Sequence, residues 1–437
     1  MGFKETRTIG LIGLGDMGLM YGRVLSEAGW NVVGCDREEL FEETKHKLQY
    51  EKFKLVKNGF EVARVSDYVL YSVEAENIAK IVRLYGPATK VGAIVGGQTS
   101  CKVPEIEAFE EFVPADVDII SLHSMHGPKV DPTGQPLVVI PHRVSKDENK
   151  KFIEEVVSEF KSKVVELSAH EHDKITADTQ AVTHAAFLSM GKAWGKIDTY
   201  PWTAARWIGG IENAKTNIAL RIYSNKWHVY AGLAITNKFA HHQMLQYSKS
   251  TTELFTLMVQ GQKDELRKRL MSARNYVFKD ILDNPQHELL LDDDLLLQFS
   301  LANMPPNSEN SNSHLSLLAI VDSWFQLQMV PYNHIICSTP LFRIFLGVTE
   351  YLFIKDGLLD AAIDCAIDDY RFRRDDLEFT LATRTWSSVV RYGDYKLYQK
   401  EFEETQSFFQ PKFAEANRIG NEMIRTILQK VKERDTK

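Results

Sequence analysis

The chain has 437 residues, of which 44% are hydrophobic and 25% are charged, a composition that supplies enough apolar material for a large folded core. The 52 basic and 59 acidic residues leave a net charge of −7, which argues against a nucleic-acid-binding protein, because such proteins carry a basic surplus on one face. The 23 Phe, 16 Tyr and seven Trp residues exclude a mainly disordered chain.

Up to about residue 170, short β-branched apolar runs alternate with amphipathic stretches, a pattern that predicts a mostly parallel sheet covered by helices. The predicted strands are Thr8–Gly13, Asn31–Cys35, Tyr68–Val73, Ala93–Gly96, Asp118–Leu122, Leu137–Ile140 and Val164–Leu167. The predicted helices are Met17–Ala28, Glu38–Gln49, Ile78–Tyr85, Val103–Phe112 and Lys150–Lys161. We therefore expect residues 1–170 to form an α/β domain built from right-handed β-α-β units.

After residue 170 the strand signals fade and the apolar spacing becomes helical. The clearest helical stretches are Lys174–Trp194, Tyr230–Val259, Asp264–Phe278, His314–Gln328, Phe342–Ile354 and Leu397–Phe409. The Pro- and Asn-rich segment Asn303–Ser313 predicts a loop, and the charged tail after Ile427 predicts a frayed end. We expect residues 171–437 to form an all-α domain.

A weak internal similarity runs through this helical half. Tyr223–Gly232 resembles Ser338–Gly347, and Gly261 and Gly393 precede similarly spaced apolar side chains, although the interval between the copies differs from one pair to the other. A duplication over about residues 171–300 and 314–437 would let one chain pack as a pseudo-dimer, in place of a homodimer of two chains. Chance similarity between helical hairpins is the alternative explanation.

The four cysteines lie far apart and form no C-x-x-C pair, which excludes a zinc ribbon and a disulfide scaffold. No apolar run approaches the roughly 18 residues that a membrane helix needs. The N-terminus also lacks the apolar region of a signal peptide. We therefore expect a cytoplasmic protein with neither membrane nor nucleic-acid partners.

The segment Gly-Leu-Gly-Asp-Met-Gly at residues 13–18 follows the first predicted strand and opens the first predicted helix. This is the context of the dinucleotide fingerprint, in which Gly13 permits a tight turn, Gly15 lets the backbone approach the pyrophosphate, and Gly18 brings helix and strand together. The helix N-terminus then faces the phosphates. The predicted cofactor-binding residues are Gly13, Gly15, Asp16, Met17, Gly18, Asp36 and Arg37.

The end of the second predicted strand bears on which dinucleotide binds. Asp36 suits the ribose 2′-hydroxyl of NAD, whereas Arg37 could neutralise the 2′-phosphate of NADP. An exposed, charged helix start at Arg37–Glu39 would explain the same residues without any ligand. Sequence position alone leaves these alternatives open.

His123 directly follows the predicted strand Asp118–Leu122. In open α/β sheets, ligands bind at the carboxyl ends of the strands, and an imidazole can accept a proton near neutral pH. His123 is therefore a candidate general base. The spacing of His123 and His126 resembles a metal-binding pair, but no third ligand follows at a suitable interval, so we predict no metal site.

Two further polar segments adjoin the predicted sheet. Ser100 and Lys102 follow a strand at the same edge as His123, where they would suit a polar ligand, although Ser100 could instead be a helix N-cap. The segment His170, Glu171, His172 and Asp173 also resembles a set of metal ligands. First-turn acids together with a surface histidine explain that segment more simply.

Six motifs, in this order, resemble the prephenate dehydrogenase family and in particular its fungal NADP-dependent members. They are residues 13–18, Ser100–Lys102, His123–Pro128, Glu171–Asp173, Gln180–His184 and Ser338–Arg343. The resemblance spans nearly the whole chain. It implies a Rossmann domain followed by an all-α domain, as in 6-phosphogluconate dehydrogenase, with NADP rather than NAD as the cofactor. It also implies the oxidative decarboxylation of prephenate to 4-hydroxyphenylpyruvate and CO2 in tyrosine biosynthesis.

The same resemblance implies roles for individual residues. His123 would deprotonate the ring hydroxyl of prephenate, and Ser100 would support that histidine. Gln180 and His184 would line the substrate pocket. The family uses an arginine to bind a carboxylate of prephenate, a role for which the planar guanidinium is well suited. Arg343 matches that arginine, but chain order places Lys226 at the corresponding point, so either could bind the carboxylate.

Two other functions compete with this interpretation. A β-hydroxyacid dehydrogenase would share the fold but would need a helix-borne lysine beside an asparagine, which Lys215 and Asn217 imitate poorly. A nucleotide-sensing regulator without turnover is the non-enzymatic alternative. The presence of His123 and Ser100 at the same predicted edge argues against it.

Overall fold

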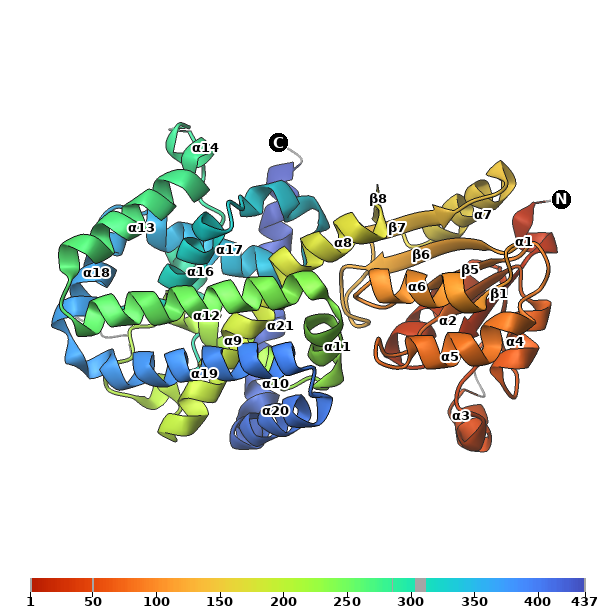
Figure 1. Cartoon of the computed structure of the whole chain (residues 1–437), viewed down its shortest axis with the longest axis horizontal. Coiled ribbons are helices and arrows are strands. Elements are labelled where there is room, and N and C mark those ends of the chain that lie inside the picture. The colour runs from red at the N-terminus through yellow and green to blue at the C-terminus, as the bar shows by residue number, and fades with distance from the viewer. Residues whose placement is uncertain (1, 49–50, 285, 303–311, 436–437) are drawn as a thin grey trace. The chain divides into compact units, whose positions relative to one another are not determined.

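The computed structural model describes residues 2–48, 51–284, 286–302 and 312–435. Backbone contacts divide the chain into unit 1, Met1–Thr176, and unit 2, Ala177–Lys437. Figure 1 shows a sheet with helices in unit 1 and helices alone in unit 2. The division falls inside a run of helical turns, whereas the sequence pattern suggested a boundary near residue 170.

Within the described residues, unit 1 contains an eight-stranded sheet in the order β3-β2-β1-β4-β5-β6-β7-β8. Its strands are β1 Thr8–Ile12, β2 Asn31–Cys35, β3 Lys54–Leu55, β4 Tyr68–Tyr71, β5 Ile94–Gly97, β6 Asp118–Ser124, β7 Pro136–Arg143 and β8 Lys163–Glu166. Neighbouring strands from β3 to β6 pair in parallel. Strand β7 is antiparallel to β6 and parallel to β8. The sheet is mostly parallel, as predicted.

Apolar side chains on both faces of this sheet explain its place between two helical layers. Ile9 and Leu11 of β1 belong to one buried cluster with α2 and α7, whereas Ile12 belongs to a second cluster with α4, α5 and α6. The helices of unit 1 are α1 Phe3–Thr6, α2 Asp16–Glu27, α3 Phe41–Lys47, α4 Gly59–Val65, α5 Ile78–Tyr85, α6 Val103–Phe112, α7 Asp147–Ser158 and α8 Ala169–Thr176.

Unit 2 consists of helices throughout its described residues, which confirms the predicted fold class. They are α9 Val182–Ile197, α10 Ile211–Tyr223, α11 His228–Thr236, α12 Lys238–Val259, α13 Lys263–Val277, α14 Lys279–Leu282, α15 Asp293–Gln298, α16 Leu315–Gln326, α17 Pro340–Ile354, α18 Leu358–Asp368, α19 Arg373–Tyr392, α20 Tyr395–Phe409 and α21 Phe413–Asp435. A π-helical turn, η3 Ala177–Ala181, precedes α9, and the 3-10 turn η5 Pro331–Cys337 precedes α17. Helices α16 and α17 are buried almost all round and form the centre of the core.

The structure differs from the sequence predictions for unit 2 at two places, and a third prediction is not tested. The stretch Tyr230–Val259 is two helices, because Asn237 interrupts it and its side chain caps α12 by accepting a hydrogen bond from the backbone N–H of Phe239 at 3.0 Å. The tail expected to fray after Ile427 continues α21 as far as Asp435. The predicted loop Asn303–Ser313 lies, apart from its last two residues, outside the described residues.

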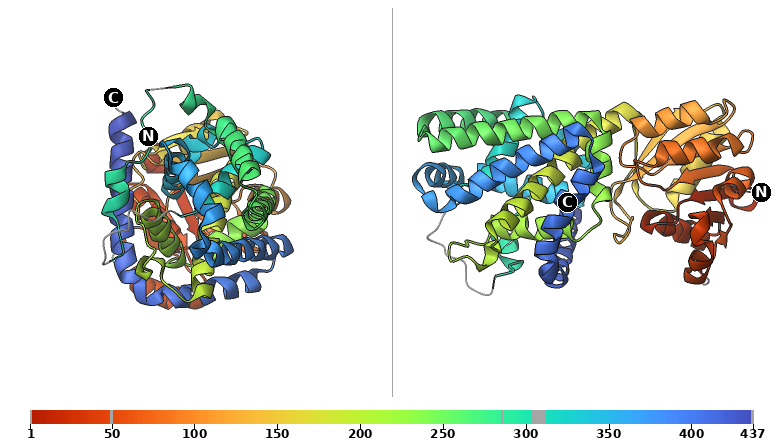
Figure 2. Two further views of the ribbon diagram at one scale, coloured as in Figure 1. Left: turned by 90° about the vertical axis from the view of Figure 1, so that its left-hand side faces the viewer. Right: turned by 60° about the horizontal axis from the view of Figure 1, so that its bottom comes forward.

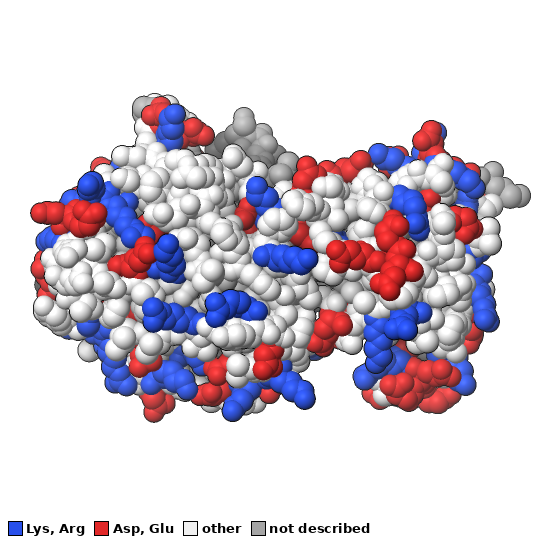
Figure 3. All heavy atoms as spheres, in the orientation of Figure 1, with Lys and Arg blue, Asp and Glu red and all other residues white. Residues whose placement is uncertain are grey.

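On the face drawn in Figure 3, Lys and Arg side chains are interspersed with Asp and Glu over each unit. Among the described residues, no helix combines the length and the apolar character needed to cross a membrane.

Candidate active site

The turn from β1 into α2 has the backbone geometry of a dinucleotide-binding turn. Gly13 has φ 100°, and a Cβ atom on it would lie 2.3 Å from the backbone oxygen of Ser72. A Cβ atom on Gly18 would lie 2.1 Å from the oxygen of Gly13, so strand and helix approach too closely for any side chain there. At Gly15, the N-cap of α2, a Cβ would meet nothing within 4 Å. The open side of the turn therefore leaves the helix N-terminus accessible to a phosphate group.

The end of β2 presents a carboxylate and a guanidinium side by side. The Asp36 carboxylate accepts a hydrogen bond from the backbone N–H of Arg37 at 2.8 Å, while the Arg37 side chain is exposed. An exposed guanidinium suits a 2′-phosphate, because its planar fork matches the phosphate oxygens. Together with the open turn at Gly15, these residues fit an NADP molecule.

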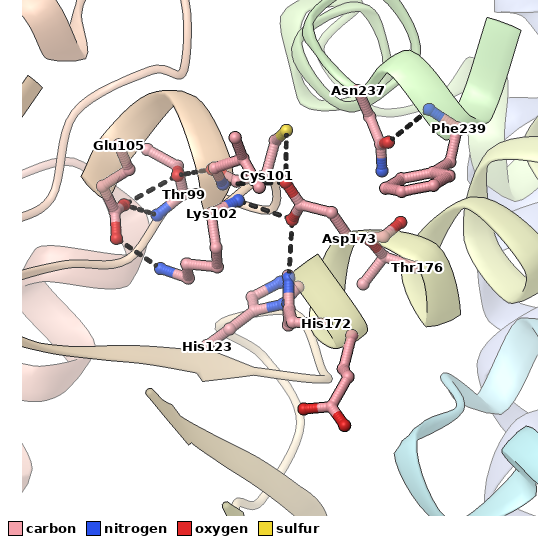
Figure 4. Close-up of polar contacts among 12 residues, drawn as sticks. Thr99, Cys101, Lys102, Glu105, His123, His172, Asp173, Thr176, Asn237 and Phe239 are labelled. Carbon is pink, nitrogen blue, oxygen red and sulfur yellow. Dashed lines mark hydrogen bonds and ion pairs between the residues drawn. The ribbon is translucent and has the colours of Figure 1, made fainter. Parts of the chain in front are cut away.

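His123 lies in β6 and is the first member of a buried chain of hydrogen bonds, which Figure 4 shows. Its Nδ1 atom lies 2.7 Å from Nε2 of His172, and Nδ1 of His172 lies 2.8 Å from Oδ1 of Asp173. The side chains of His172 and Asp173 are 1% and 2% exposed. The interpretation of residues 170–173 as first-turn acids with a surface histidine fits the exposed His170 and Glu171 but is wrong for His172 and Asp173, because His172 turns inward to meet β6 and Asp173 turns inward to meet the start of α6.

The Asp173 carboxylate is held in place by the start of α6. Its two oxygens accept hydrogen bonds from the backbone N–H groups of Lys102 at 2.6 Å and Val103 at 2.8 Å, and from Sγ of Cys101 at 3.2 Å. Lys102 is the N-cap residue of α6 and has no capping side chain of its own, so Asp173 caps this helix from a distant part of the sequence. Ser100 therefore does not cap α6.

Burial and hydrogen bonding set the protonation of this chain of residues. Burial lowers the pKa of His123 well below its usual value, and positive charge on His172 or Lys102 would lower it further. Burial also lowers the pKa of His172, although the hydrogen bond to Asp173 opposes the shift. Burial alone would raise the pKa of Asp173, but the hydrogen bonds from His172 and the two amides outweigh it and hold that pKa low. At neutral pH both imidazoles are therefore neutral and Asp173 is ionised.

Lys102, which the sequence offered as a possible ligand-binding cation, is part of the scaffold. Its ammonium group is fully buried and donates to the oxygens of Gly97 at 2.9 Å and Leu122 at 2.8 Å, and to Glu105 at 2.8 Å. An ammonium group has three protons, so these bonds use all of them. Lys102 thus ties the end of β5 to the residue before His123 and keeps β6 in position.

Ser100 is half-buried in the turn between β5 and α6. The side-chain hydrogen bonds that the structure gives in this turn come from its neighbours, and one of them joins Thr99 Oγ1 to Glu105 at 2.7 Å. His123 has His172 as its hydrogen-bond partner. The part of Ser100 in supporting His123 remains a prediction.

Unit 2 brings together the segments that carry Gln180 and Arg343. Gln180 lies on the π-helical turn η3, which is packed against η5. His334 of η5 lies 3.3 Å from Asp178 of η3. At the start of α17, Arg343 donates from Nε to Ser338 Oγ at 3.1 Å and from Nη2 to the Ile335 oxygen at 3.3 Å.

His184 and Lys226 occupy different surroundings in unit 2. His184 lies on α9, is packed edge-on against Tyr230 with ring centroids 4.8 Å apart, and has no hydrogen-bond partner for its buried Nδ1 atom among the described residues. Burial lowers the pKa of His184 to about 4. Lys226 is exposed in the turn between α10 and α11.

The roles of two parts of the candidate site were missed by sequence reasoning. One sequence signal could have revealed the role of His172 and Asp173, which form a His-Asp pair soon after the last strand of the sheet. Asp178 and His334 are far apart in the sequence, and only the packing of unit 2 brings them together. Among the described residues, no group of three or more His, Cys, Asp or Glu side chains is arranged to hold a metal ion.

Comparison with known proteins assigns both parts of the chain to one group of oxidoreductases. Residues 8–111 match the NAD binding domain of 6-phosphogluconate dehydrogenase, and residues 181–429 match a 6-phosphogluconate dehydrogenase C-terminal domain. The structure also resembles that of a prephenate dehydrogenase from A. aeolicus, solved with hydroxyphenyl propionate and NAD+. The TM-score is 0.50 at 16% identity, over 64% of this chain and 99% of that one, which supports the fold alone.

Two relatives match almost from end to end. The prephenate dehydrogenase [NADP(+)] of Saccharomyces cerevisiae is 59% identical over 98% of this chain and 95% of its own length. The probable prephenate dehydrogenase [NADP(+)] of Schizosaccharomyces pombe is 56% identical over 98% of this chain and 99% of its own length. These matches confirm the resemblance carried by the six motifs. The chain belongs to the family of NADP-dependent prephenate dehydrogenases.

Proposed function

We propose that this chain catalyses the NADP+-dependent oxidative decarboxylation of prephenate to 4-hydroxyphenylpyruvate and CO2, a step of tyrosine biosynthesis. Membership of the family is the observation that supports this reaction most directly. The buried hydrogen-bond chain from His123 through His172 to Asp173 also makes His123 suitable as its general base. The glycine turn at residues 13–18, with Asp36 and Arg37, would hold the dinucleotide. NADP+, when bound, accepts the hydride that leaves the hydroxyl-bearing ring carbon.

The hydrogen-bond chain assigns the protons on both imidazoles. An ionised Asp173 can only accept, so Nδ1 of His172 carries a hydrogen and donates it. Nε2 of neutral His172 is then an acceptor, and Nδ1 of His123 must donate to it. The one remaining nitrogen of His123, Nε2, therefore has a free lone pair. We propose that this Nε2 atom accepts the proton of the ring hydroxyl.

Once His123 has accepted this proton, its positive charge needs stabilising in a buried place. The Nδ1–H of the imidazolium donates to His172, and the carboxylate of Asp173 lies at the far end of the chain. A fixed negative charge in a poorly solvated environment favours the protonated base more strongly than it would in water. His172 and Asp173 thus act as positioning residues for His123.

We assign the binding of a substrate carboxylate to Arg343 rather than Lys226. Two hydrogen bonds from its guanidinium, to Ser338 and to the Ile335 oxygen, fix Arg343 at the start of α17, next to η5. A pre-oriented guanidinium loses less conformational entropy on binding a carboxylate than an exposed lysine does. Gln180 and His184 remain the residues proposed to line the substrate pocket.

The test is prephenate-dependent reduction of NADP+, followed by the absorbance of the reduced nicotinamide. We expect turnover with prephenate and no appreciable turnover of 3-hydroxyacids, and the His123→Asn variant should lower kcat by roughly 10²- to 10⁴-fold. The absence of reduction with prephenate and either dinucleotide would contradict the assignment. Turnover of 3-hydroxyacids alone would favour a β-hydroxyacid dehydrogenase.

We also propose a cytoplasmic location. The supporting observation is that Cys35, Cys101, Cys337 and Cys365 are all free and buried, as expected in a reducing compartment. Fluorescence microscopy of a tagged full-length chain in its own cell type would test it. Enrichment in an organelle would contradict the proposal.

A further inference from the structure

Five successive helices of unit 2 occur twice in the same order. Helices α9, α10, α11, α12 and α13 are followed by α16, α17, α18, α19 and α20, and each helix begins about 130 residues before its counterpart. The hairpins α12–α13 and α19–α20 both turn at a glycine, Gly261 with φ 66° and Gly393 with φ 67°. The two sets therefore agree in order, spacing and local backbone.

The packing of these helices is reciprocal, as a pseudo-two-fold axis requires. Helix α9 packs against α19, and its counterpart α16 packs against α12. Likewise α13 packs against α16 and α18, while α20 packs against α9 and α11. The long helices α12 and α19, which are counterparts of one another, lie side by side (Figures 1 and 2).

This pairing replaces the one suggested by the sequence. Tyr223–Gly232 spans the end of α10 and part of α11, whereas Ser338–Gly347 lies at the start of α17, so these segments are not counterparts. With α10 paired to α17 instead, the interval between the starts of counterpart helices varies only from 129 to 135 residues. The internal repeat is then a pseudo-dimer folded from one chain.

The repeat predicts a counterpart for the polar cluster around Asp178. That cluster joins three places: the turn before α9, the first turns of α12 through the hydrogen bond from Gln243 to Asp178, and the turn before α17 that carries His334. Their counterparts are the segment before α16, the first turns of α19 and the segment before α10.

A cavity of about 70 Å³ lies at that second place, within unit 2. Its walls include Asn312 and Ser316 around the start of α16, Asp376 on α19, and Arg206, Trp207 and Lys215 before and within α10. The corresponding nucleotide-binding machinery is missing, because α15 and not a strand-bearing domain precedes this second set of helices in the described chain. The cavity therefore corresponds by its place in the repeat to the cluster around Asp178, but no nucleotide-binding turn precedes this second set of helices in the described chain.

The polar groups that line this cavity include more donors than acceptors that are still available. The acids already accept: Glu212 from the Ile208 N–H at 3.2 Å and from Asn312, and Asp376 from Ser313 Oγ at 2.8 Å. Two buried donors have no acceptor among the described residues. These are Nε1 of Trp207 and the hydroxyl group of Ser316. Lys215, which is only 8% exposed, lines the same cavity and has no hydrogen bond or ion pair among the described residues.

Unused buried donors cost free energy unless a ligand or water supplies acceptors. The charge of Arg206 is paired with that of Asp375, whose two oxygens accept hydrogen bonds from Nη2 of Arg206 at 2.6 and 2.7 Å. Burial raises the pKa of Asp376 to about 7, so its repulsion of an anion is weakened at neutral pH. Burial lowers the pKa of Lys215, and the carboxyl groups of Glu212, Asp376 and Asp375 oppose this shift without accepting a hydrogen bond from its ammonium group. The local need is thus for acceptor oxygens.

We propose that this cavity is a second, non-catalytic ligand site, which binds a small carboxylate through Lys215 and Trp207. The ligand is limited to two or three carbons, since a volume of about 70 Å³ is well below the roughly 150 Å³ of a cavity that binds benzene. A bound carboxylate joins the starts of α10, α16 and α19. The site lies entirely in unit 2 and does not depend on the catalytic role of His123.

Acetate is the probe, with acetamide as the uncharged molecule of the same shape. Titration calorimetry of the full chain at constant ionic strength should show saturable binding of acetate and at least tenfold weaker binding of acetamide. Lys215→Met should weaken acetate binding at least tenfold, and Trp207→Phe should weaken it severalfold. Lys249→Met, which changes an exposed lysine of α12, is the matched control and should bind acetate as the unchanged chain does.

Several outcomes would overturn the proposal. They are no saturable binding of acetate by the unchanged chain, equal binding of acetamide, or unchanged binding by both Lys215→Met and Trp207→Phe. If Arg343→Ala abolishes acetate binding and Lys215→Met does not, the acetate occupies the proposed substrate-carboxylate anchor. Lys215→Met should retain prephenate oxidation, so failure of this site and failure of the proposed function are distinguishable. Should Lys215→Met not fold, Trp207→Phe decides.

Discussion

Replacing Asp173 by asparagine tests the proposed proton arrangement with a change of a single atom. The carboxylate accepts from three N–H groups, those of Lys102, Val103 and His172. An asparagine amide has one acceptor oxygen and one NH2 group. In either orientation, therefore, the amide NH2 faces a backbone N–H of α6 that formerly had an acceptor.

The two orientations bound the size of the effect. If the NH2 group faces His172, it donates to Nδ1, both imidazoles adopt the opposite tautomer, and Nε2 of His123 already carries a hydrogen. The general base is then lost, which costs roughly 10²- to 10⁴-fold in kcat. If the oxygen faces His172, the tautomers persist but the negative charge is gone, and loss of about 1.4 kcal/mol of stabilisation lowers kcat about tenfold.

The assay is the initial rate of NADP+ reduction at saturating prephenate, with kcat/KM measured from acidic to alkaline pH. We expect kcat of Asp173→Asn to fall at least about tenfold. The acidic limb of kcat/KM should move to lower pH, because without the carboxylate the imidazolium is less stable and the pKa of the histidine pair falls. Loss of folded protein alone would lower the rate without moving this limb.

Glu171→Gln is the matched control, since Glu171 precedes the pair, is exposed and accepts only from Ser168 in the described contacts. It should leave kcat and the pH profile unchanged. The proposed roles of His172 and Asp173 would be refuted by a folded Asp173→Asn variant with kcat within about twofold of the unchanged chain and with an unshifted acidic limb.

Three further predictions concern the cofactor, the glycine turn and pH. Arg37→Ala should raise KM for NADP+ about 10- to 100-fold while changing KM for NAD+ little, as steady-state kinetics with both cofactors will show; equal changes would remove Arg37 from 2′-phosphate binding. Gly13→Ala should cost at least about 2 kcal/mol of unfolding free energy in urea titrations, since φ is 100° and a Cβ would lie 2.3 Å from Ser72; a stable variant would contradict the constraint. The His184 pKa of about 4 lies below the usual 6.5, so the stability it contributes is full above pH 6.5 and is lost as pH falls toward 4, by roughly 3 kcal/mol. The unfolding free energy from urea titrations should therefore differ less between pH 7 and pH 5 in His184→Leu than in the unchanged chain. An equal difference in both proteins would contradict the lowered pKa of His184.

Local sequence patterns predicted most of unit 1 because its elements are short, apolar and bounded by strong signals. Helix α5 and helix α6 begin and end at the predicted residues, Ile78–Tyr85 and Val103–Phe112. Strand β3 has only two residues, and α4 is a short helix capped by Asn58, so neither produces enough periodicity to be recognised. Such elements depend on the strands beside them.

The candidate site was predicted in part, and the difference has a physical cause. The glycines of residues 13–18 and His123 follow strand ends, so chain order alone places them at an edge of the sheet. His172 and Asp173 are polar and lie in the middle of the short helix α8, and exposure is the usual outcome for such residues. Their burial depends on partners in β6 and at the start of α6, which are 49 and 71 residues away in the sequence. Pattern reasoning cannot supply such partners.

The remote capping of α6 has a practical meaning for dissecting this enzyme. A shortened chain that stops at residue 170, where the sheet pattern ends, would lack Asp173 and leave the first amides of α6 without their acceptor. It would also free the ring of His123 to rotate, because His172 would be gone. An isolated nucleotide-binding half must therefore include Asp173, and the end of unit 1 at Thr176 is a suitable limit for gene fusions or split-protein designs.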